Sequence, residues 1–332
     1  MLVLRLSSLL GLILISWAKS VDQLHPLSDE FIKLINSKQK LWTAGRNFHV
    51  STPLSYLKSL AGTLEVNSDD IPEVSYDNFK LVQPPRYFDA RHAWPYCPSL
   101  YDVRDQGSCG SCWAVSAASA MTDRFCIKNG GRKHFYFSAH DILSCCVRCS
   151  NGCVGGILSK AWYYYEKYGV VSGGHYNSSQ GCRPYNIPPC QHEGKQSDRP
   201  ACRNRSSTPK CQNICIDSYT INYTNDKQKN NRRSYKPKDM LGIQWDLFFN
   251  GPVTTTFNLY EDFLSYKFGV YKYTVGKLLG RHSVKLIGWG TRDGVDYWIA
   301  TNSWNTDWGE QGFFQIIRGS DHCGLESGAV VG

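Results

Sequence analysis

Hydrophobic residues recur at helical spacing through much of the first two thirds of the chain. Residues 27–36 place apolar side chains three and four positions apart behind Ser28, a residue type that caps helix N-termini. Runs without helix breakers predict further helices over 113–128, 158–168 and 239–249. Between the predicted helices at 27–36 and 113–128, residues 62–83 are polar and turn-rich, which predicts an exposed tether that is easy to cleave.

The last third of the chain changes to the two-residue alternation of β-strands. Gly251 and Pro252 precede a β-branched run that ends near Phe257. Similar runs follow at 284–290, 297–301 and 312–318, and they predict a barrel-like sheet. Helices first and strands afterwards indicate an α+β protein of two lobes with a cleft between them. The length of 332 residues allows one large domain or two smaller ones.

The N-terminus has the composition of a secretory signal peptide. Arg5 is followed by an apolar block to Trp17 and a small-residue site at Ala18-Lys19-Ser20, which predicts removal of residues 1–20. The apolar block is too short for a membrane anchor, and no later segment is long and apolar enough to cross a bilayer. We therefore expect a protein of the secretory pathway without a membrane partner.

Cysteine content and charge agree with export. Fourteen cysteines imply a disulfide framework, and Asn177, Asn204 and Asn222 begin glycosylation sequons. The net charge of +9 comes from the chain after residue 83, with six basic residues in 227–238. We interpret that run as a solvated loop, with contact to an acidic substrate or surface as the alternative. No nucleic-acid-binding module surrounds it, so nucleic acid is not an expected partner.

One stretch carries the candidate chemistry, Asp105-Gln106-Gly107-Ser108-Cys109-Gly110-Ser111-Cys112-Trp113-Ala114. Its glycines and serines predict a loop that leads into the helix at 113–128, so Cys112 lies where a helix dipole lowers a thiol pKa. A redox pair or half of a metal site is the alternative for Cys109 and Cys112. A nucleophilic thiol needs a base and a group that orients the base. His282 and Asn302 border the strand-like runs of the last third.

These three segments resemble the active-site segments of papain-like cysteine proteases, in their cathepsin B-like branch. The resemblance implies a papain-like two-lobed fold, with a helical left lobe and a β-barrel-like right lobe. It implies a catalytic triad of Cys112, His282 and Asn302. Gln106 is expected to donate a hydrogen bond to the oxyanion, and Trp304 to shield the contact between histidine and asparagine from water.

Further segments match substrate-binding and regulatory parts of that family. Gly155 and Gly156 resemble the glycines whose bare backbone pairs with the substrate as an extra strand. The segment from the helix at 27–36 to Leu57 resembles a short propeptide that crosses the cleft in reverse. The resemblance therefore implies a propeptide at 21–83 and a mature enzyme at 84–332. A pro-domain with a function of its own is the alternative.

The resemblance also implies the cysteine pairing, which spacing alone leaves open. The small cluster Cys145-Cys146-Val147-Arg148-Cys149 could otherwise be drawn as a zinc site, but export favours disulfides. The implied arrangement leaves Cys112 and Cys323 free. Its six bridges are Cys97–Cys126, Cys109–Cys153, Cys145–Cys211, Cys146–Cys149, Cys182–Cys215 and Cys190–Cys202.

An insertion at about 182–215 marks the first departure from a minimal papain-like chain. His282 follows Cys112 by 170 residues, against roughly 130–150 in the family. The insertion resembles the start of cathepsin B's occluding loop, in which two adjacent histidines bind the C-terminal carboxylate of the substrate. Here His192 is followed by Glu193, whose charge would repel that carboxylate. We therefore expect weak dipeptidyl-carboxypeptidase activity, and a contact between His192 and Asp105.

Two further departures concern specificity. Arg281 precedes the catalytic histidine where cathepsin B has glycine. A cation there opposes protonation of the imidazole but favours the thiolate, which leaves its net effect on the ion pair open. Gly328 stands where cathepsin B carries a glutamate at the base of its S2 pocket, which receives the second residue before the cleaved bond (P2). We expect apolar or aromatic P2 residues and poor cleavage after Arg-Arg.

Together these features predict a cysteine endopeptidase that hydrolyses proteins after zymogen activation, in acidic lysosomal or digestive surroundings. No metal or cofactor is expected, and the expected partners of a monomer are peptide substrates, its own propeptide and cystatin-type inhibitors. The run at 297–310 is similar to gut cathepsin B-like proteases of blood-feeding worms, which hints at digestion of host protein. Secretion and lysosomal delivery both remain open. The alternative function is that of a catalytically inactive relative serving as a binding or matrix protein.

Overall fold

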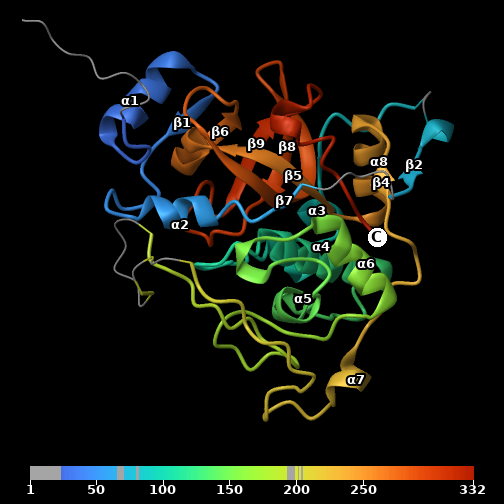
Figure 1. Ribbon diagram of the computed structural model, residues 1–332. Coiled ribbons are helices and arrows are strands. Elements are labelled where there is room, and N and C mark those ends of the chain that lie inside the picture. The colour runs from blue at the N-terminus through green and yellow to red at the C-terminus, as the bar shows by residue number, and fades with distance from the viewer. Residues whose placement is uncertain (1–23, 66–70, 80–81, 193–198, 201, 203–204) are drawn as a thin grey trace, which may run out of the picture.

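The computed structural model describes residues 24–65, 71–79, 82–192, 199–200, 202 and 205–332. The predicted signal peptide and Glu193 lie outside these residues. Figure 1 shows a lobe of strands above a lobe of helices, with the N-terminal segment beside both. None of the helices within the described ranges has the length and apolar character that a membrane span requires.

The helical lobe is built around one buried helix, α4 (Cys112–Lys128). Its alanines and serines are buried, and small side chains let neighbouring segments approach closely. The helices α5 (Ala139–Cys145) and α6 (Leu158–Lys167) pack against it (Figure 1). Aromatic side chains of α6 and of the segment before α5, among them Trp162 and Phe137, complete this core.

The strand lobe is a single twisted sheet centred on the long strand β7 (Leu278–Arg292). In the described chain the order of strands is β1-β6-β9-β8-β7-β3, where β1 is Trp42–Ala44 and β3 is Phe88–Asp89, and β5 pairs with the other part of β7. The strands of the last third are β5 (Val253–Tyr260), β6 (Tyr266–Tyr271), β8 (Val295–Thr301) and β9 (Phe313–Ile317). The predicted α+β architecture is confirmed, and each of the four predicted helices ends within two residues of its observed bounds.

Short elements connect these parts. The strand β3 (Phe88–Asp89) pairs with β7 and is followed by α3 (Ala90–Ala93) and η4 (Pro98–Tyr101), while η5 (Gly152–Val154) lies between α5 and α6. The helix α8 (Met240–Asn250) begins at its N-cap Asp239 and packs against β7. In the strand lobe, η6 (Glu261–Ser265) precedes β6 and η7 (His322–Gly324) follows β9.

A buried ion pair joins the two lobes where α4 crosses β7. The Lys285 ammonium lies 2.6 Å from the Asp123 carboxylate and donates to the Ser119 hydroxyl at 2.8 Å. Removing one partner of such a buried pair leaves an unpaired charge, a change that typically costs about 3–5 kcal/mol. The pair therefore fixes the position of the second half of α4 relative to β7.

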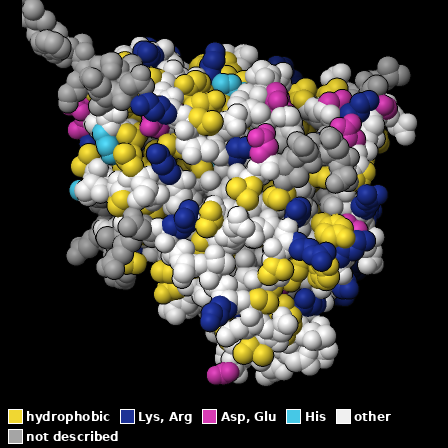
Figure 2. Space-filling model, in the orientation of Figure 1, with side chains coloured by type: hydrophobic (Ala, Val, Ile, Leu, Met, Phe, Trp, Pro, Cys, Tyr) yellow, Lys and Arg dark blue, Asp and Glu magenta, His cyan; other side chains and the backbone are white. Residues whose placement is uncertain are grey.

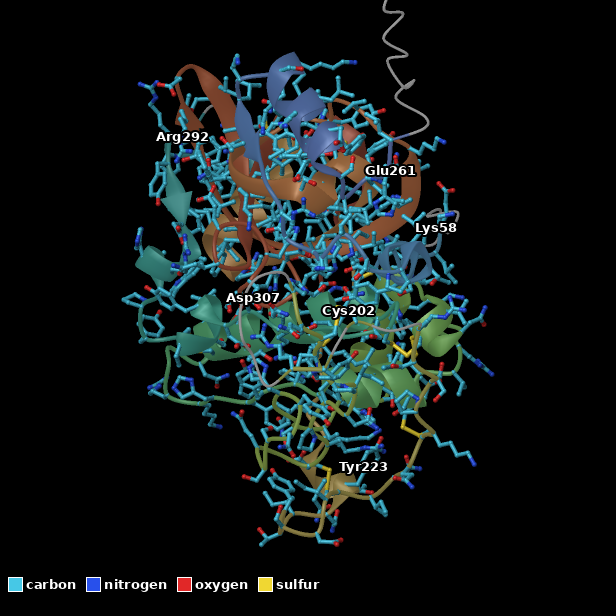
Figure 3. All side chains as sticks on the ribbon, turned by 90° about the vertical axis from the view of Figure 1, so that its left-hand side faces the viewer. Lys58, Cys202, Tyr223, Glu261, Arg292 and Asp307 are labelled. Atoms are coloured by element: carbon cyan, nitrogen blue, oxygen red, sulfur yellow. A yellow bond between two sulfur atoms is a disulfide. The ribbon has the colours of Figure 1, made fainter. Side chains whose placement is uncertain are left out.

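The N-terminal segment is anchored on the strand lobe and then crosses between the lobes. Helix α1 (Asp29–Lys38) begins with the predicted cap, because the Ser28 hydroxyl accepts from the Phe31 N–H. The strand β1 (Trp42–Ala44) extends the sheet by pairing with β6. Figures 1 and 3 then place α2 (Leu54–Ser59) at the junction of the two lobes, where Lys58 is labelled.

The described part of the tether is exposed at several positions, as predicted for 62–83, and it is also docked on the rest of the protein, which the prediction did not include. The strand β2 (Glu73–Val74) pairs in parallel with β4 (Lys236–Pro237), and η3 (Asp77–Phe79) follows. The Tyr76 hydroxyl donates to Asp246 at 3.0 Å, and the Phe79 ring packs on aromatic rings of α8. These two aromatic residues supply the contacts that a count of polar residues overlooks.

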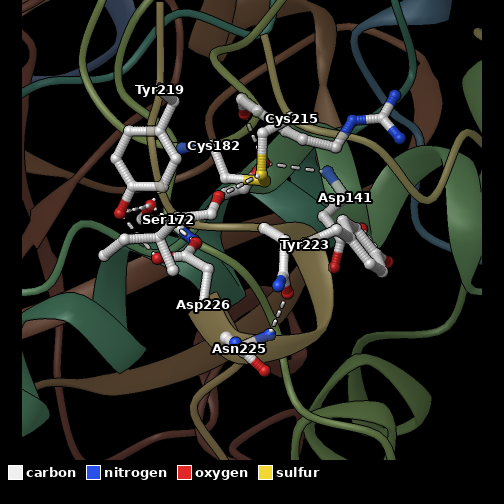
Figure 4. Close-up of a disulfide and its surroundings, with 12 residues drawn as sticks. Asp141, Ser172, Cys182, Cys215, Tyr219, Tyr223, Asn225 and Asp226 are labelled. Atoms are coloured by element: carbon white, nitrogen blue, oxygen red, sulfur yellow. Dashed lines mark hydrogen bonds between the residues drawn. A yellow bond between two sulfur atoms is a disulfide. The ribbon is translucent and has the colours of Figure 1, made fainter. Parts of the chain in front are cut away.

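The disulfide arrangement that the resemblance implied is confirmed in all six bridges. Cys112 and Cys323 are free. Figure 4 shows the bridge between Cys182 and Cys215 beside a buried network, in which Asp226 accepts from the Ser172 hydroxyl at 2.7 Å. This network and the short helix α7 (Tyr223–Asp226) fix both ends of the insertion to the helical lobe.

Candidate active site

Cys112 is the first residue of α4 and is fully buried. Its sulfur lies 3.3 Å from the hydroxyl of Thr63, a residue of the N-terminal segment. Burial raises the pKa of the thiol, but the charge and hydrogen bond of His282 lower it more, so the net pKa is below its ordinary value. Cys112 therefore has the environment that a reactive thiolate requires.

His282 lies in β7, opposite Phe257 of β5, and faces an oxygen atom with each ring nitrogen. Nε2 is 2.8 Å from the Asn302 side-chain oxygen, and Nδ1 is 3.1 Å from the backbone oxygen of Leu60. A neutral imidazole carries a single N–H, so only the imidazolium satisfies both contacts as a donor. This geometry matches a cationic histidine paired with a thiolate.

Asn302 is held in one orientation. Its side-chain oxygen also accepts from the Ser303 N–H at 2.8 Å, which directs that oxygen towards the histidine. The Trp304 ring lies 4.9 Å from the His282 ring, and all three side chains are buried. The predicted shield over the contact between His282 and Asn302 is consistent with this packing.

Gln106 and His282 converge on one carbonyl group. The Gln106 side-chain N–H₂ donates to the Leu60 oxygen at 3.3 Å and to the Cys109 oxygen at 2.8 Å. The Ser303 hydroxyl donates to the Gln106 side-chain oxygen at 2.7 Å and thereby fixes the amide. Sequence reasoning missed this role of Ser303, although a hydroxyl directly after Asn302 is the signal that could have suggested it.

The predicted glycine pair meets the N-terminal segment. The Gly156 N–H donates to the Gly62 oxygen at 2.9 Å, and the Leu64 N–H donates to the Gly156 oxygen at 2.8 Å. The bridge between Gly156 and Thr63 is parallel. A side chain at Gly156 would collide with the Trp113 ring, at 2.4 Å from its nearest atom, so this position requires glycine.

The N-terminal segment approaches the catalytic loop so closely that it requires a glycine of its own. A Cβ atom at Gly62 would lie 2.0 Å from the Gly110 oxygen, which is backbone and cannot rotate away. Gly155, at φ +146°, lies next to the same Gly62 oxygen. Residues 60–64 therefore fill the space in front of Cys112.

His192 does not pair with Asp105 in this structure, which corrects that prediction. The two Asp105 carboxylate oxygens accept from the Gly107 N–H at 2.7 Å and from the Asn305 amide at 2.8 Å. His192 is buried instead against Phe48, with ring centroids 4.5 Å apart. Burial lowers the pKa of His192 to about 4, although Asp307 opposes the shift.

Gly328 and Arg281 both border a pocket on the far side of Gly156. A Cβ atom at Gly328 would lie 2.1 Å from the Thr256 backbone oxygen, so this backbone leaves no room for the glutamate found in cathepsin B. Arg281 pairs with Glu65, with a nitrogen-to-oxygen distance of 3.1 Å. The predicted specificity positions thus lie at one pocket, while Glu193 is outside the described residues.

One group of side chains has the spacing of metal ligands, Cys190, His192 and Cys202. The two cysteines are joined to each other by a disulfide. A disulfide has no thiolate to offer, so this group does not fit a metal in the oxidised protein.

Comparison with known proteins gives a consistent result. Residues 84–332 match the papain family of cysteine proteases, and residues 27–67 match the propeptide of peptidase family C1. Cathepsin B-like cysteine proteinase 6 of Caenorhabditis elegans is 43% identical over 92% of this chain and 82% of its own length. Cathepsin B-like cysteine proteinase of Schistosoma japonicum is 40% identical over 94% of this chain and 92% of its own.

Solved structures agree. Procathepsin B S9 from Trypanosoma congolense superposes with a TM-score of 0.80 at 33% identity, over 93% of this chain and 98% of that one. Digestive procathepsin L2 from Tenebrio molitor, at 24% identity and a TM-score of 0.69 over 91% of this chain and 88% of that one, shares the fold. The chain therefore belongs to the papain family of cysteine proteases, as a cathepsin B-like cysteine protease with its propeptide attached.

Proposed function

We propose that the mature protein hydrolyses peptide bonds of proteins through a Cys112–His282–Asn302 triad. One observation supports this above all others. The Leu60 carbonyl oxygen lies within hydrogen-bonding distance of both His282 and Gln106, and Thr63 of the same segment touches the Cys112 sulfur. A peptide carbonyl can therefore be held beside the nucleophile by the groups that acyl transfer needs.

In the proposed mechanism the Cys112 thiolate attacks the substrate carbonyl carbon, and its carbonyl oxygen becomes an oxyanion. The Gln106 amide and the Cys112 backbone N–H stabilise that charge, and such donors typically contribute about 3–4 kcal/mol each. His282 gives its proton to the leaving amine, and water then attacks the acyl-enzyme with His282 as the base. Asn302 keeps the imidazole oriented through both steps.

The propeptide is proposed to inhibit by occupying the cleft in the reverse direction. A substrate strand that pairs with Gly156 in the productive sense would run antiparallel to it, whereas the bridge to Thr63 is parallel. The reversed chain places the Leu60 carbonyl group beside the catalytic groups, and it does not present a peptide bond in the position for cleavage. We place the propeptide at 21–83 and the mature enzyme at 84–332, in line with the two family matches.

Specificity and setting form the finer part of the proposal. Glu193 stands where a second histidine would follow His192, which favours endopeptidase over dipeptidyl-carboxypeptidase activity. The apolar residues that line the pocket at Gly328 favour apolar P2 side chains. Six disulfides support an oxidising secretory route, whether to lysosomes or to the outside of the cell.

The test is active-site titration of the acid-activated protein with an epoxide that alkylates thiolates. We expect labelling of one equivalent at Cys112, with loss of peptidase activity in proportion, and neither labelling nor activity in Cys112→Ala. Cys323→Ala is the matched control, because burial raises the pKa of that second free thiol to about 12. A folded, processed protein that takes no label would favour the inactive binding-protein alternative.

A further inference from the structure

The pocket beyond Gly156 combines an apolar wall with two cationic side chains. Its mature walls come from the start of α6, from β7 and from the C-terminal segment. The apolar part consists of Ile157, Leu158, Ala329 and Val330. Lys236 and Arg281 complete the lining on the side that the propeptide covers.

Arg281 is held firmly at this pocket. The Arg281 backbone in β7 lies opposite Asn258 of β5 in the sheet, and its carbonyl oxygen accepts from the Thr63 N–H at 3.0 Å. One guanidinium nitrogen binds Glu65, while the buried Nε has no hydrogen-bond partner. The side chain is 28% exposed, so it is desolvated in part and has donor capacity left for a second oxygen.

Lys236 brings the second charge. Its backbone lies in β4, directly after Tyr235, whose bridge to Val331 joins two segments of the mature enzyme, whereas the parallel pairing with Glu73 belongs to the propeptide. It forms no ion pair within the described part of the chain. Its ammonium group is therefore available to a ligand of opposite charge in the pocket.

The carboxylate that pairs with Arg281 belongs to the propeptide. Among the described lining residues Glu65 alone is acidic, and the mature residues of the lining include no aspartate or glutamate. Removal of the propeptide takes away this neutralising charge and leaves Arg281 and Lys236 at the rim. A pocket of this composition favours an anionic side chain and repels a cationic one.

We propose that Arg281 and Lys236 are specificity-determining residues that make the S2 pocket accept glutamate at P2 in preference to its neutral isostere glutamine. The inference rests on the proposed peptidase function and deepens it. The apolar wall accommodates the methylene groups of the glutamate side chain, and its carboxylate meets the two cations. Apolar P2 residues still enter the pocket, whereas arginine at P2 is excluded by charge.

The test compares two peptides that differ only by glutamate or glutamine at P2, cleaved by the mature enzyme at pH 6, where the glutamate is ionised. We expect a kcat/KM ratio of glutamate to glutamine of about threefold to fivefold at low salt, the range that partly exposed ion pairs reach. The ratio should fall at high salt and at pH 4.

Substitutions of the two cations test whether they cause the preference for glutamate. Arg281→Gln and Lys236→Gln should each lower the ratio, and the double variant should bring it to about one. Arg281→Lys should retain most of it, because the positive charge stays. Arg292→Gln, a charge removal at the exposed far end of the same strand, is the matched control and should leave the ratio unchanged.

A wild-type ratio of one or below would overturn the inference, as would a ratio that survives in the double variant. The proposed function is read separately, from epoxide labelling of Cys112 and from cleavage of a peptide with phenylalanine at P2. Activity on that peptide without a preference for glutamate would leave the peptidase assignment standing and reject the role of the two cations.

Discussion

The two halves of the cleft are blocked by different physical means. On the unprimed side, which receives residues before the cleaved bond, the propeptide pairs its backbone with Gly156 and places Gly62 against the catalytic loop. On the primed side, Phe48 is buried between His192 and Trp304. The first contact depends on close backbone approach, and the second depends on side-chain packing against a titratable ring.

This difference implies that acidity acts unequally on the two halves. Backbone hydrogen bonds at Gly156 carry no titratable group, so they persist at low pH. His192 is neutral when it is buried under Phe48, and protonation favours its release to water. We therefore expect activation in acid to begin on the primed side, and the following experiments are arranged to break or sharpen that contrast.

Among single substitutions compared at neutral pH, the largest effect is expected from Gly62→Ala in the propeptide. The new Cβ atom would meet the Gly110 oxygen at 2.0 Å, and overpacking against fixed backbone costs up to about 3 kcal/mol. Inhibition of the mature enzyme by added propeptide should weaken by about 100-fold, measured as the inhibition constant. Gly45→Ala is the control, because its Cβ atom would meet only the Lys267 side chain. Equal inhibition by both variants would contradict the close backbone approach.

Phe48→Ala tests the primed half and should have a somewhat smaller effect. Phe48 is fully buried, and its ring lies 4.5 Å from that of His192 and 6.0 Å from that of Trp304. Loss of a buried aromatic anchor at an interface typically costs 2 kcal/mol or more, which corresponds to about 30-fold in the inhibition constant. The exposed Leu54→Ala should change inhibition little. A negligible effect of Phe48→Ala would place the affinity on the unprimed side alone.

How far the sequence predicts this cleft depends on whether the determinants are local. Cys112 at a helix start and His282 in a strand follow from nearby glycines and from strand alternation, and both lie where that pattern indicates. The orientation of Asn302 needs the Ser303 N–H, which is also local. These features lie within a few residues of the side chains they position.

The features that sequence reasoning missed join distant segments. The Leu60 carbonyl meets His282 across 222 residues, and Arg281 meets Glu65 across 216. Tyr76 reaches Asp246 across 170. No local pattern encodes such pairs, because their proximity results from how the propeptide folds onto the finished sheet. The expected pair of His192 and Asp105 was wrong for the same reason, since Phe48 takes the space beside His192.

The third experiment follows the pH dependence of propeptide binding. His192 has a pKa of about 4 in the complex and an ordinary value near 6.5 when exposed. Its contribution is therefore complete above pH 6.5, declines as the pH falls towards 4 and then levels off. Binding should weaken by up to about tenfold per pH unit in that window. His192→Gln should flatten this part of the profile, whereas the exposed His92→Gln should not. An identical slope in both variants would exclude His192 as the titrating group.

The smallest effect is expected at the C-terminal end of the substrate, and it tests whether the primed half recognises charge at all. An enzyme that releases dipeptides must hold a free carboxylate two residues after the cleaved bond, and here Glu193 follows His192 where a second histidine would supply a donor. A peptide with a free carboxylate and its amidated twin should therefore be cleaved at the same bond at rates within about twofold of each other, because attraction by His192 and repulsion by Glu193 oppose. Glu193→His should shift the preference towards the free carboxylate severalfold, and Glu193→Gln should give an intermediate value. A strong wild-type preference for the free carboxylate would show that the primed half also selects by charge, with its positive partner elsewhere in the insertion.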